Sequence, residues 1–293
     1  MYPRYLSAIL GVTLVVACSP DQPTPGEESA VPSVVAAPAA LPGGLPDLIV
    51  DARRLAASWA VYDQSFPSTS CSVQESEMSP GDHRVLRFTV STPNVGTGDV
   101  YVGDPLAHMA ANDGLFEYAA CHAHLHFRNY ATYELVDPAG QRILLAAKRG
   151  FCMLDVARYK TPGGPKPGKW RYRSCGTLTT PGDQGISPGW ADVYDKQLDG
   201  QFFVLDEAGA PVPPGNYVIR ITVNPPFVCG TEDDARPRDA QGMCHNFAEA
   251  NYDNNVGEAP ITVPAVVGSN GAGPGGGAPA PKLGMTHKTF ESQ

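Results

Sequence analysis

Apolar and polar residues alternate in short runs along the middle of the chain, separated by clusters of Pro, Gly, Asn and Asp. Such alternation places one set of side chains on one face of a strand. The clearest runs span residues 85–90, 130–136, 201–205 and 216–223. The second run enters a turn at 137–140 and returns through 141–147, which is the pattern of a β-hairpin. Because helical periodicity is weak throughout, the sequence predicts a single all-β, sandwich-like domain.

The two ends of the chain differ from this middle part. Residues 1–17 hold Arg4 and then an apolar run, as a signal peptide does, and the run is too short for a membrane span. The stretch before Cys18 resembles a bacterial lipobox, so we expect lipidation of Cys18, with an ordinary cleaved signal as the alternative. Residues 18–44, rich in Pro and Ala, predict a flexible tether. The domain is expected over 45–265, followed by a disordered Gly/Pro-rich tail over 266–293.

Charge and cysteine content narrow the class of protein. The formal net charge of −9 argues against a nucleic-acid partner and suits a cationic one. Without Cys18, six cysteines remain, and an even number in an exported chain predicts three disulfides. These are Cys71, Cys121, Cys152, Cys175, Cys229 and Cys244. Residues 150–200 carry few strand signals, so we expect long loops there, pinned by disulfides.

The segment Cys-His-Ala-His-Leu-His at 121–126 carries the strongest chemical signal. On an extended strand His122, His124 and His126 would all point to one face. Three convergent imidazoles suit a borderline metal such as copper or zinc, and they leave positions open for water, dioxygen or substrate. Without a metal, such a face would leave ring nitrogens to be satisfied in some other way.

Further segments accompany the histidines in a fixed order: residues 82–88, 148–152, 185–189, 192–194, 214–217, 224–225 and 254–255. In this combination the chain resembles the lysyl oxidase catalytic domain, from about residue 45 to 263. The resemblance implies copper bound by His122, His124 and His126. It also implies a lysine tyrosylquinone cofactor made from Lys148 and Tyr194.

The resemblance further implies an amine oxidase. Such an enzyme converts a primary amine, for example peptidyl lysine, and dioxygen to an aldehyde, hydrogen peroxide and ammonia. Asp192 and Asp155 are both candidates for the proton acceptor or for a partner of a histidine N–H, and the sequence does not choose between them. In the unprocessed chain Lys148 and Tyr194 need not touch, because the 150–200 region is the expected mover.

The resemblance also implies a calcium site and a set of cysteine pairs. The calcium ligands would be Asp47, the Leu48 carbonyl, Glu249, Asn251, Asn254 and Asn255, with an Asn-rich turn as the alternative. Cys121 and Cys175 match a family disulfide. Cys229 and Cys244 flank an insertion and would close it, which leaves Cys71 to pair with Cys152.

Two other functions compete with the oxidase. A non-catalytic copper- or zinc-binding surface protein would keep the histidines without needing Lys148 beside Tyr194. An adhesion module would depend on the calcium cluster instead. In either case we expect an exported protein that is lipid-anchored at the outer membrane or cell surface, or else secreted, with a lipid anchor as its only contact with the membrane.

Overall fold

A computed structural model gives the structure of the chain, and it describes residues 43–75, 78–146, 148, 150–207 and 211–284. The chain divides into two units, Met1–Ser33 and Val34–Gln293, and the first lies wholly outside the described residues. The expected signal peptide at 1–17, Cys18 and nearly all of the tether at 18–44 therefore lie outside them too. Within the described part, no helix is both long and apolar enough to cross a membrane.

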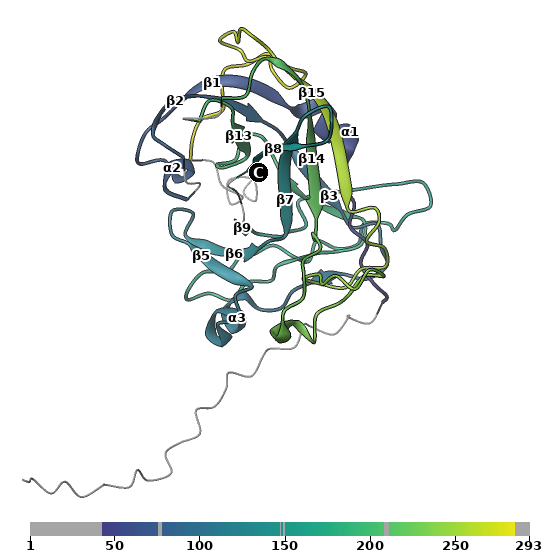
Figure 1. Cartoon of the computed structure of the whole chain (residues 1–293). Helices are drawn as coiled ribbons and strands as arrows, with labels where there is room; N and C mark the ends of the chain where they lie inside the picture. The colour runs from purple at the N-terminus through teal and green to yellow at the C-terminus, as the bar shows by residue number, and fades with distance from the viewer. Residues whose placement is uncertain (1–42, 76–77, 147, 149, 208–210, 285–293) are drawn as a thin grey trace, which may run out of the picture. The chain divides into compact units, whose positions relative to one another are not determined.

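Strands dominate the described residues, which confirms the all-β prediction (Figure 1). The early strands are β1 (Ala60–Phe66), β2 (Gly81–Arg87), β3 (Val90–Pro93), β4 (Val100–Tyr101), β5 (Phe116–Ala119), β6 (His124–Arg128), β7 (Ala131–Val136) and β8 (Arg142–Leu145). The later ones are β9 (Gly150–Phe151), β10 (Ala157–Arg158), β11 (Gly185–Ile186), β12 (Trp190–Tyr194), β13 (Phe202–Val204), β14 (Gly215–Val223) and β15 (Val256–Val263). The predicted hairpin is confirmed by the pairing of β7 with β8.

Several small sheets share one core. The largest has the order β15-β14-β7-β8, and three-stranded sheets have the orders β1-β2-β13, β10-β12-β3 and β5-β6-β9. Strands β4 and β11 form a two-stranded sheet. All these pairs are antiparallel, and β14 shows the expected alternation of buried and exposed residues along its length.

Short helices that the sequence analysis missed cover parts of this arrangement. They are α1 (Ala52–Ser58), α2 (Cys71–Glu75), α3 (Pro105–Ala111) and the 3-10 turn η1 (Thr231–Asp233). Helix α1 begins after Asp51, whose side chain accepts a hydrogen bond from the Arg54 amide. Helix α3 begins with Pro105 after Asp104 and ends at Asn112 in the left-handed conformation. Helices this short contain too few turns to show a clear 3.6-residue period.

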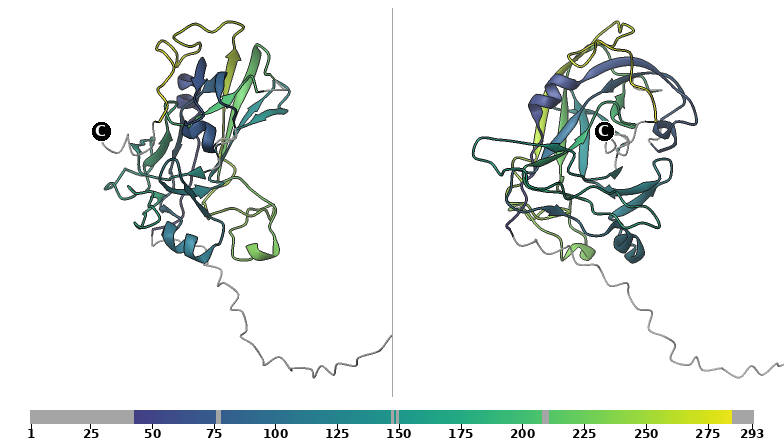
Figure 2. Two further views of the ribbon diagram at one scale, coloured as in Figure 1. Left: turned by 90° about the vertical axis from the view of Figure 1, so that its left-hand side faces the viewer. Right: turned by 180° about the vertical axis from the view of Figure 1, so that it is seen from behind.

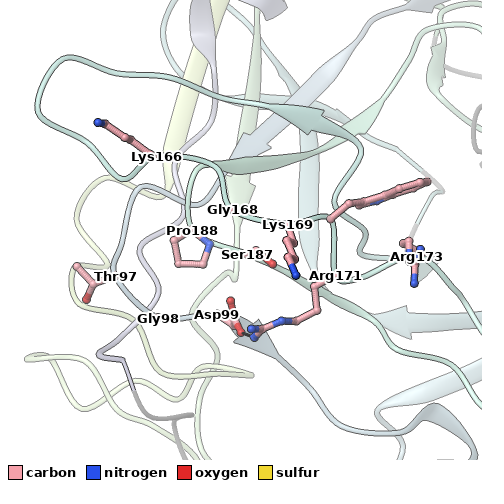
Figure 3. A pocket seen from close by; sticks show the side chains of 11 residues that line it. Thr97, Gly98, Asp99, Lys166, Gly168, Lys169, Arg171, Arg173, Ser187 and Pro188 are labelled. Atoms are coloured by element: carbon pink, nitrogen blue, oxygen red, sulfur yellow. Dashed lines mark hydrogen bonds and ion pairs between the residues drawn. The ribbon is translucent and has the colours of Figure 1, made fainter.

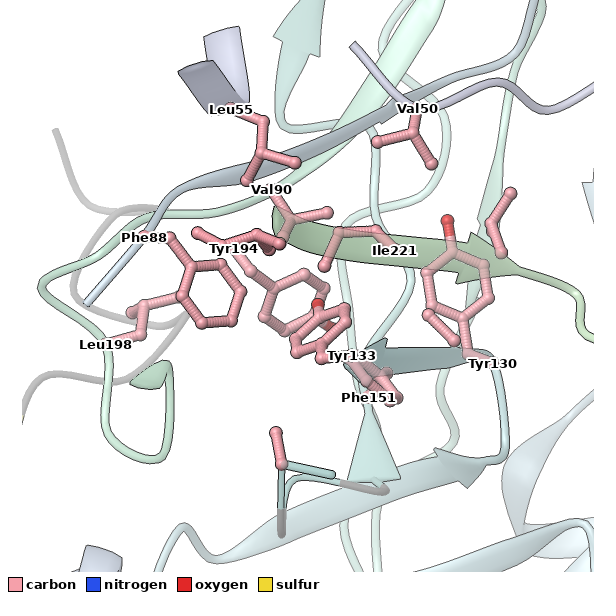
Figure 4. Packing of buried hydrophobic residues seen from close by; sticks show 14 of the residues in the cluster. Val50, Leu55, Phe88, Val90, Tyr130, Tyr133, Phe151, Tyr194, Leu198 and Ile221 are labelled. Atoms are coloured by element: carbon pink, nitrogen blue, oxygen red, sulfur yellow. The ribbon is translucent and has the colours of Figure 1, made fainter. Parts of the chain in front are cut away.

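The core is built around one aromatic ring. Phe151 of β9 lies edge-on to three tyrosines, Tyr130, Tyr133 and Tyr194, with ring centroids 5.5, 5.5 and 5.2 Å away (Figure 4). Edge-to-face pairs at this separation are favourable beyond the area that they bury. Because the tyrosines come from β7, β12 and the turn before β7, this ring fixes β9 against the rest of the core.

The disulfides differ from the expected pairing in two of three cases. The structure joins Cys71 to Cys121 and Cys152 to Cys175, so the expected pairs Cys121–Cys175 and Cys71–Cys152 are wrong. The Cys229–Cys244 pair is confirmed. All four cysteines of the misassigned pairs lie in the segments around the histidines and β9, so residue order alone does not set their connectivity.

The Gly/Pro-rich segment at 266–284, expected to be part of a disordered tail, packs against the domain (Figures 1 and 2). Ala272 and Val61 of β1 exchange two backbone hydrogen bonds of 2.8 and 2.9 Å. A Cβ on Gly271 would come within 2.4 Å of the Tyr62 ring, and one on Gly273 within 2.5 Å of Trp59. The glycines therefore allow the backbone to approach aromatic rings, which is a packing requirement rather than a sign of disorder. Residues 285–293 lie outside the described part.

Truncation after residue 265 should destabilise the domain. Ala280 and Leu283 pack against the apolar cluster that contains Tyr62, Phe66 and Phe202. Their loss, together with that of the Ala272 bonds, should cost about 2–4 kcal/mol of unfolding free energy. Chemical denaturation measures this difference. Truncation after Gly284 is the control and should leave the midpoint unchanged; equal midpoints for the two truncations would contradict the packing role.

Candidate functional site

The three histidines converge, although only two of them lie on a strand. His124 and His126 belong to β6, whereas His122 lies in the preceding turn and Ala123 has a left-handed φ of 57°. The expectation of one continuous strand over 121–126 is therefore wrong at its start. The ring centroids nevertheless lie 4.8–5.8 Å apart, so the turn brings His122 back to the other two.

The spacing of two ring nitrogens fits a bound metal. The Nε2 atoms of His124 and His126 are 2.9 Å apart. Two imidazoles at a metal–nitrogen distance of about 2.05 Å would place these atoms roughly 2.9 Å apart at a right angle and roughly 3.3 Å apart at a tetrahedral angle. The observed spacing is also that of a hydrogen bond between the two rings, so it places both nitrogens within reach of one ion without selecting the metal. The donor set of three imidazoles suits a borderline metal such as copper or zinc.

Glu75 supports His122 and was missed in the sequence analysis. Its carboxylate lies 2.5 Å from His122 Nδ1 and accepts a hydrogen bond of 2.7 Å from the Cys121 amide. Burial alone would raise the pKa of Glu75, but the contacts with His122 and Cys121 outweigh it and lower the pKa. The Cys71–Cys121 disulfide ties α2, which ends at Glu75, to the histidine turn. A carboxylate on one ring nitrogen orients the other for a metal.

A second carboxylate lies beside this cluster. A sulfur of Cys71, a ring nitrogen of His122 and a carboxylate oxygen of Asp199 all lie within 4.8 Å of one another. Because Cys71 is disulfide-bonded, it offers no thiolate to a metal. Asp199 accepts hydrogen bonds from Ser72 and from the Gly284 amide, which brings the packed C-terminal segment to the edge of the site.

Lys148 and Tyr194 lie together. The Lys148 Nζ atom is 5.1 Å from the centroid of the Tyr194 ring and 5.3 Å from that of Phe151. The Tyr194 hydroxyl donates to the Cys152 carbonyl at 2.9 Å and accepts from the Cys152 amide at 2.6 Å. The unprocessed chain thus already brings the amine over the phenol ring, without movement of the 150–200 region.

Strand β9 connects this pair to the histidines. Phe151 and Gly150 of β9 pair with Phe127 and Arg128 at the end of β6. A Cβ on Gly150 would come within 2.6 Å of His126 Nδ1, so glycine lets the backbone that follows Lys148 lie directly against the imidazole. The imidazole cluster and the lysine–tyrosine pair therefore form one continuous site.

Burial shifts the pKa of the Lys148 amine. The side chain is half-buried, and desolvation of the amine lowers its pKa from 10.5 to about 8. The carboxylates of Glu75, Asp192, Asp199 and Glu117 oppose this shift without cancelling it. With this pKa only about a tenth of the amine is neutral at pH 7, and the neutral, nucleophilic fraction grows as pH rises through about 8.

The two candidate carboxylates, Asp192 and Asp155, have different surroundings. Asp192 lies in β12 two residues before Tyr194, so both belong to the same face of the strand. Burial raises the pKa of Asp192 well above its usual range, while Lys148 is among the groups that lower it.

Asp155 has a structural environment instead. Its carboxylate accepts hydrogen bonds from the backbone amides of Arg171, Tyr172 and Ser187 and from the Ser187 hydroxyl. These bonds join two loop segments far apart in the sequence. Burial raises the pKa of Asp155, and the bonds to Ser187, Arg171 and Tyr172 act against that rise.

Only some of the residues expected to bind calcium contact one another. Glu249 accepts hydrogen bonds from the Leu48 amide and the Asn255 side chain, and Asn254 donates to Asp47. Burial raises the pKa of Glu249 to about 7. Asn251 is exposed, and its side chain accepts a bond from the nearby Asp253 amide. The segments around Asp47 and Glu249 therefore lie together, with Asn251 exposed, and calcium binding stays a prediction.

Together these features define an all-β protein with an imidazole cluster beside a lysine–tyrosine pair. The lysyl oxidase family model matches residues 46–245. The chain therefore belongs to the lysyl oxidase family, as the sequence motifs indicated.

Curated relatives agree with this assignment. The chain is 30% identical over 202 residues to protein-lysine 6-oxidase of Sus scrofa, an alignment that covers 65% of this chain and 72% of the relative. It is also 30% identical to protein-lysine 6-oxidase and to lysyl oxidase homolog 1 of Homo sapiens, covering 65% and 63% of this chain. The alignments span only 43% and 30% of those two human proteins.

Proposed function

We propose that this protein is a copper-dependent amine oxidase. It would convert primary amines, peptidyl lysine among them, together with dioxygen and water, to aldehydes, hydrogen peroxide and ammonia. The observation that carries the proposal is the position of the Lys148 amine, 5.1 Å from the centre of the Tyr194 ring, in a site continuous with three converging imidazoles. The names of the curated relatives support the same reaction.

His122, His124 and His126 would hold the copper ion. The 2.9 Å spacing of the His124 and His126 Nε2 atoms suits two adjacent positions of a copper(II) centre, and the Glu75 carboxylate leaves His122 Nε2 as the free ligand atom. When bound, copper supplies the redox chemistry with dioxygen by which a tyrosine can be oxidised.

Lys148 and Tyr194 would become the lysine tyrosylquinone. The fold holds the amine close to the ring, which raises their effective concentration. A separate enzyme would then not be needed to join them. Burial and the Asp192 charge raise the pKa of Tyr194 well above its usual range, and the Cys152 amide, 2.6 Å from the phenol oxygen, acts against that rise. Partial neutrality of Lys148 supplies the lone pair needed to form a carbon–nitrogen bond.

We assign the proton acceptor to Asp192 and a structural role to Asp155. Asp192 is buried beside Lys148, and a carboxylate with a raised pKa is a better base for a proton on carbon. Asp155 already accepts four hydrogen bonds, and moving it would leave three backbone amides without a partner.

The segment around Glu249 would hold calcium as a structural ion. The Oδ1 atoms of Asn254 and Asn255 are buried without a hydrogen-bond partner among the described residues, and carbonyl oxygens of this kind are calcium ligands. With Asp47 and Glu249 they would supply two amide and two carboxylate groups. Asn251 is omitted from this set because it is exposed.

An extracellular location fits these features. Three disulfides require an oxidising compartment, and the N-terminal sequence suits export with lipidation at Cys18. The amine substrates would then be extracellular or at the cell surface, with the lipid as the membrane contact. We propose no role in nucleic-acid binding.

The non-catalytic alternative accounts for less of the site. A copper- or zinc-storage protein would use the histidines and Glu75, but it would gain nothing from a half-buried lysine over a tyrosine ring. Burying an amine in this way disfavours its charged form, as the lowered pKa of Lys148 shows. An adhesion role for the calcium segment would likewise leave Lys148 unexplained.

Lys148→Ala and Tyr194→Phe should each abolish peroxide release from a primary amine while leaving copper bound, because each removes half of the cofactor. Absorbance of the quinone and of its phenylhydrazine adduct should disappear as well. Lys160→Ala and Tyr159→Phe are the controls and should retain both signals. Full activity in either of the first two variants would refute the cofactor assignment.

Quinone formation should accelerate as pH rises through about 8. The folded-state pKa of Lys148 lies below its ordinary value of 10.5, so the amine is protonated below about pH 8 and neutral above it. The neutral fraction rises roughly tenfold between pH 7 and pH 9. Timed absorbance after aerobic copper loading measures the rate at each pH, and a rate independent of pH over this interval would show that Lys148 does not titrate there.

Glu75→Gln should weaken copper binding by roughly 10–100-fold, because a neutral amide holds His122 less firmly than a carboxylate does. Competition with a chelator of known affinity gives the change, and the paramagnetic spectrum of copper reports altered coordination. Glu134→Gln, which removes the half-buried ion-pair partner of the exposed Arg142, is the matched control. Unchanged affinity and spectrum in a folded Glu75→Gln protein would mean that Glu75 only anchors the Cys121 amide.

A further inference from the structure

A cavity of about 870 Å³ opens between loops (Figure 3), and neither the histidines nor the lysine–tyrosine pair is among the residues that line it. Three loop segments line it: residues 97–99 between β3 and β4, residues 166–173 between β10 and β11, and Ser187 with Pro188 after β11. Its volume is within the range of sites for small molecules and short oligomers, about 300–1,000 Å³. None of the residues assigned to the oxidase reaction lines this cavity.

The lining is strongly cationic. Lys166, Lys169, Arg171 and Arg173 line the cavity, whereas Asp99 is its only carboxylate. Arg171 forms an ion pair with Asp99, and Figure 3 shows its side chain reaching toward that residue. Among the described residues the other three cations have no ion-pair partner. This concentration of positive charge contrasts with the net charge of −9 on the whole chain.

Trp170 gives the cavity an exposed aromatic surface. Its side chain is 45% exposed, whereas Trp59 and Trp190 are only 8% and 6% exposed. The Arg173 guanidinium lies 5.4 Å from the Trp170 ring, which keeps a cation beside the indole. The exposed part of the indole offers an apolar, flat surface next to cations that have no ion-pair partner among the described residues.

The cavity is pre-formed by buried contacts behind it. The Asp155 carboxylate accepts bonds from the Arg171 and Ser187 amides, which belong to opposite segments of the lining. The Cys152–Cys175 disulfide holds the end of the cationic segment, and Gly189 lets Pro167 approach within 2.7 Å of where a Cβ would be. A fixed cavity loses little conformational entropy on binding.

We propose that this cavity binds an acidic polysaccharide. The unpaired cations would pair with carboxylate or sulfate groups along the polymer, and the exposed face of Trp170 would pack against the C–H face of a sugar ring. A single exposed tryptophan favours a sugar over single-stranded nucleic acid, which is bound on successive aromatic platforms. Such binding would hold the protein at a cell-surface or matrix polymer, independently of the amine reaction.

Intrinsic fluorescence offers a direct test, because only one of the three tryptophans is exposed. Tetragalacturonate and a heparin tetrasaccharide are titrated into the full-length protein at 50 and 500 mM NaCl. We expect a saturable change in tryptophan emission that Trp170→Phe abolishes and that high salt weakens several-fold. Lys166→Ala/Lys169→Ala/Arg173→Ala should weaken binding at least tenfold.

Three controls make the test decisive. Arg53→Ala/Arg54→Ala/Lys282→Ala removes equally exposed cations elsewhere and should leave binding unchanged. Neutral maltotetraose should not bind. Equal weakening by the two triple variants, or equal binding of the neutral sugar, would overturn the proposal. Tighter binding of a dT₁₀ oligonucleotide than of either acidic sugar would also overturn it, in favour of nucleic acid. Circular dichroism checks that every variant is folded.

Discussion

The packing of three tyrosines around Phe151 is the constraint on which the candidate site depends. Phe151 immediately follows Gly150, which presses against His126, and immediately precedes Cys152, whose backbone holds the Tyr194 hydroxyl. One buried ring therefore fixes the distance between the imidazoles and the phenol. Since interiors are close-packed, a shift of this ring would be transmitted to both sides of the site. The geometry of the candidate site is in this sense a property of the core.

A disulfide is the second constraint on the geometry of the candidate site. The Cys71–Cys121 disulfide crosslinks two segments 50 residues apart and so holds the short helix α2 against the histidine turn. A five-residue helix is too short to be stable alone, and the crosslink supplies what its own hydrogen bonds cannot. The consequence is chemical, because α2 ends in Glu75. Fold stability and orientation of His122 are thus provided by the same covalent bond.

Sequence patterns identified the strands and the family, but they could not identify contacts made through space. The hairpin of β7 and β8 and the histidine–lysine–tyrosine set were readable because alternation and motif order are local properties. Glu75 could not be recognised, because its partner His122 is 47 residues away in the sequence and the short helix α2 shows no periodicity. The predictions of the disulfide pairing and of disorder at residues 266–284 were wrong for the same reason. The composition of residues 266–284 suggested disorder, whereas the glycines in this segment let its backbone pack against Tyr62 and Trp59.

The half-buried amine of Lys148 shows how the fold accommodates a group whose charged form is unfavourable there. Desolvation opposes the charged form of Lys148, while surrounding carboxylates, Glu75 and Asp192 among them, partly restore it. With stronger carboxylate support the amine would stay protonated and unreactive; with none, its burial would favour the neutral form even more. The balance leaves its pKa near 8. Because Glu75 also contacts His122, one of the carboxylates that support the lysine charge is the one that orients this imidazole, so the two halves of the site are electrostatically coupled.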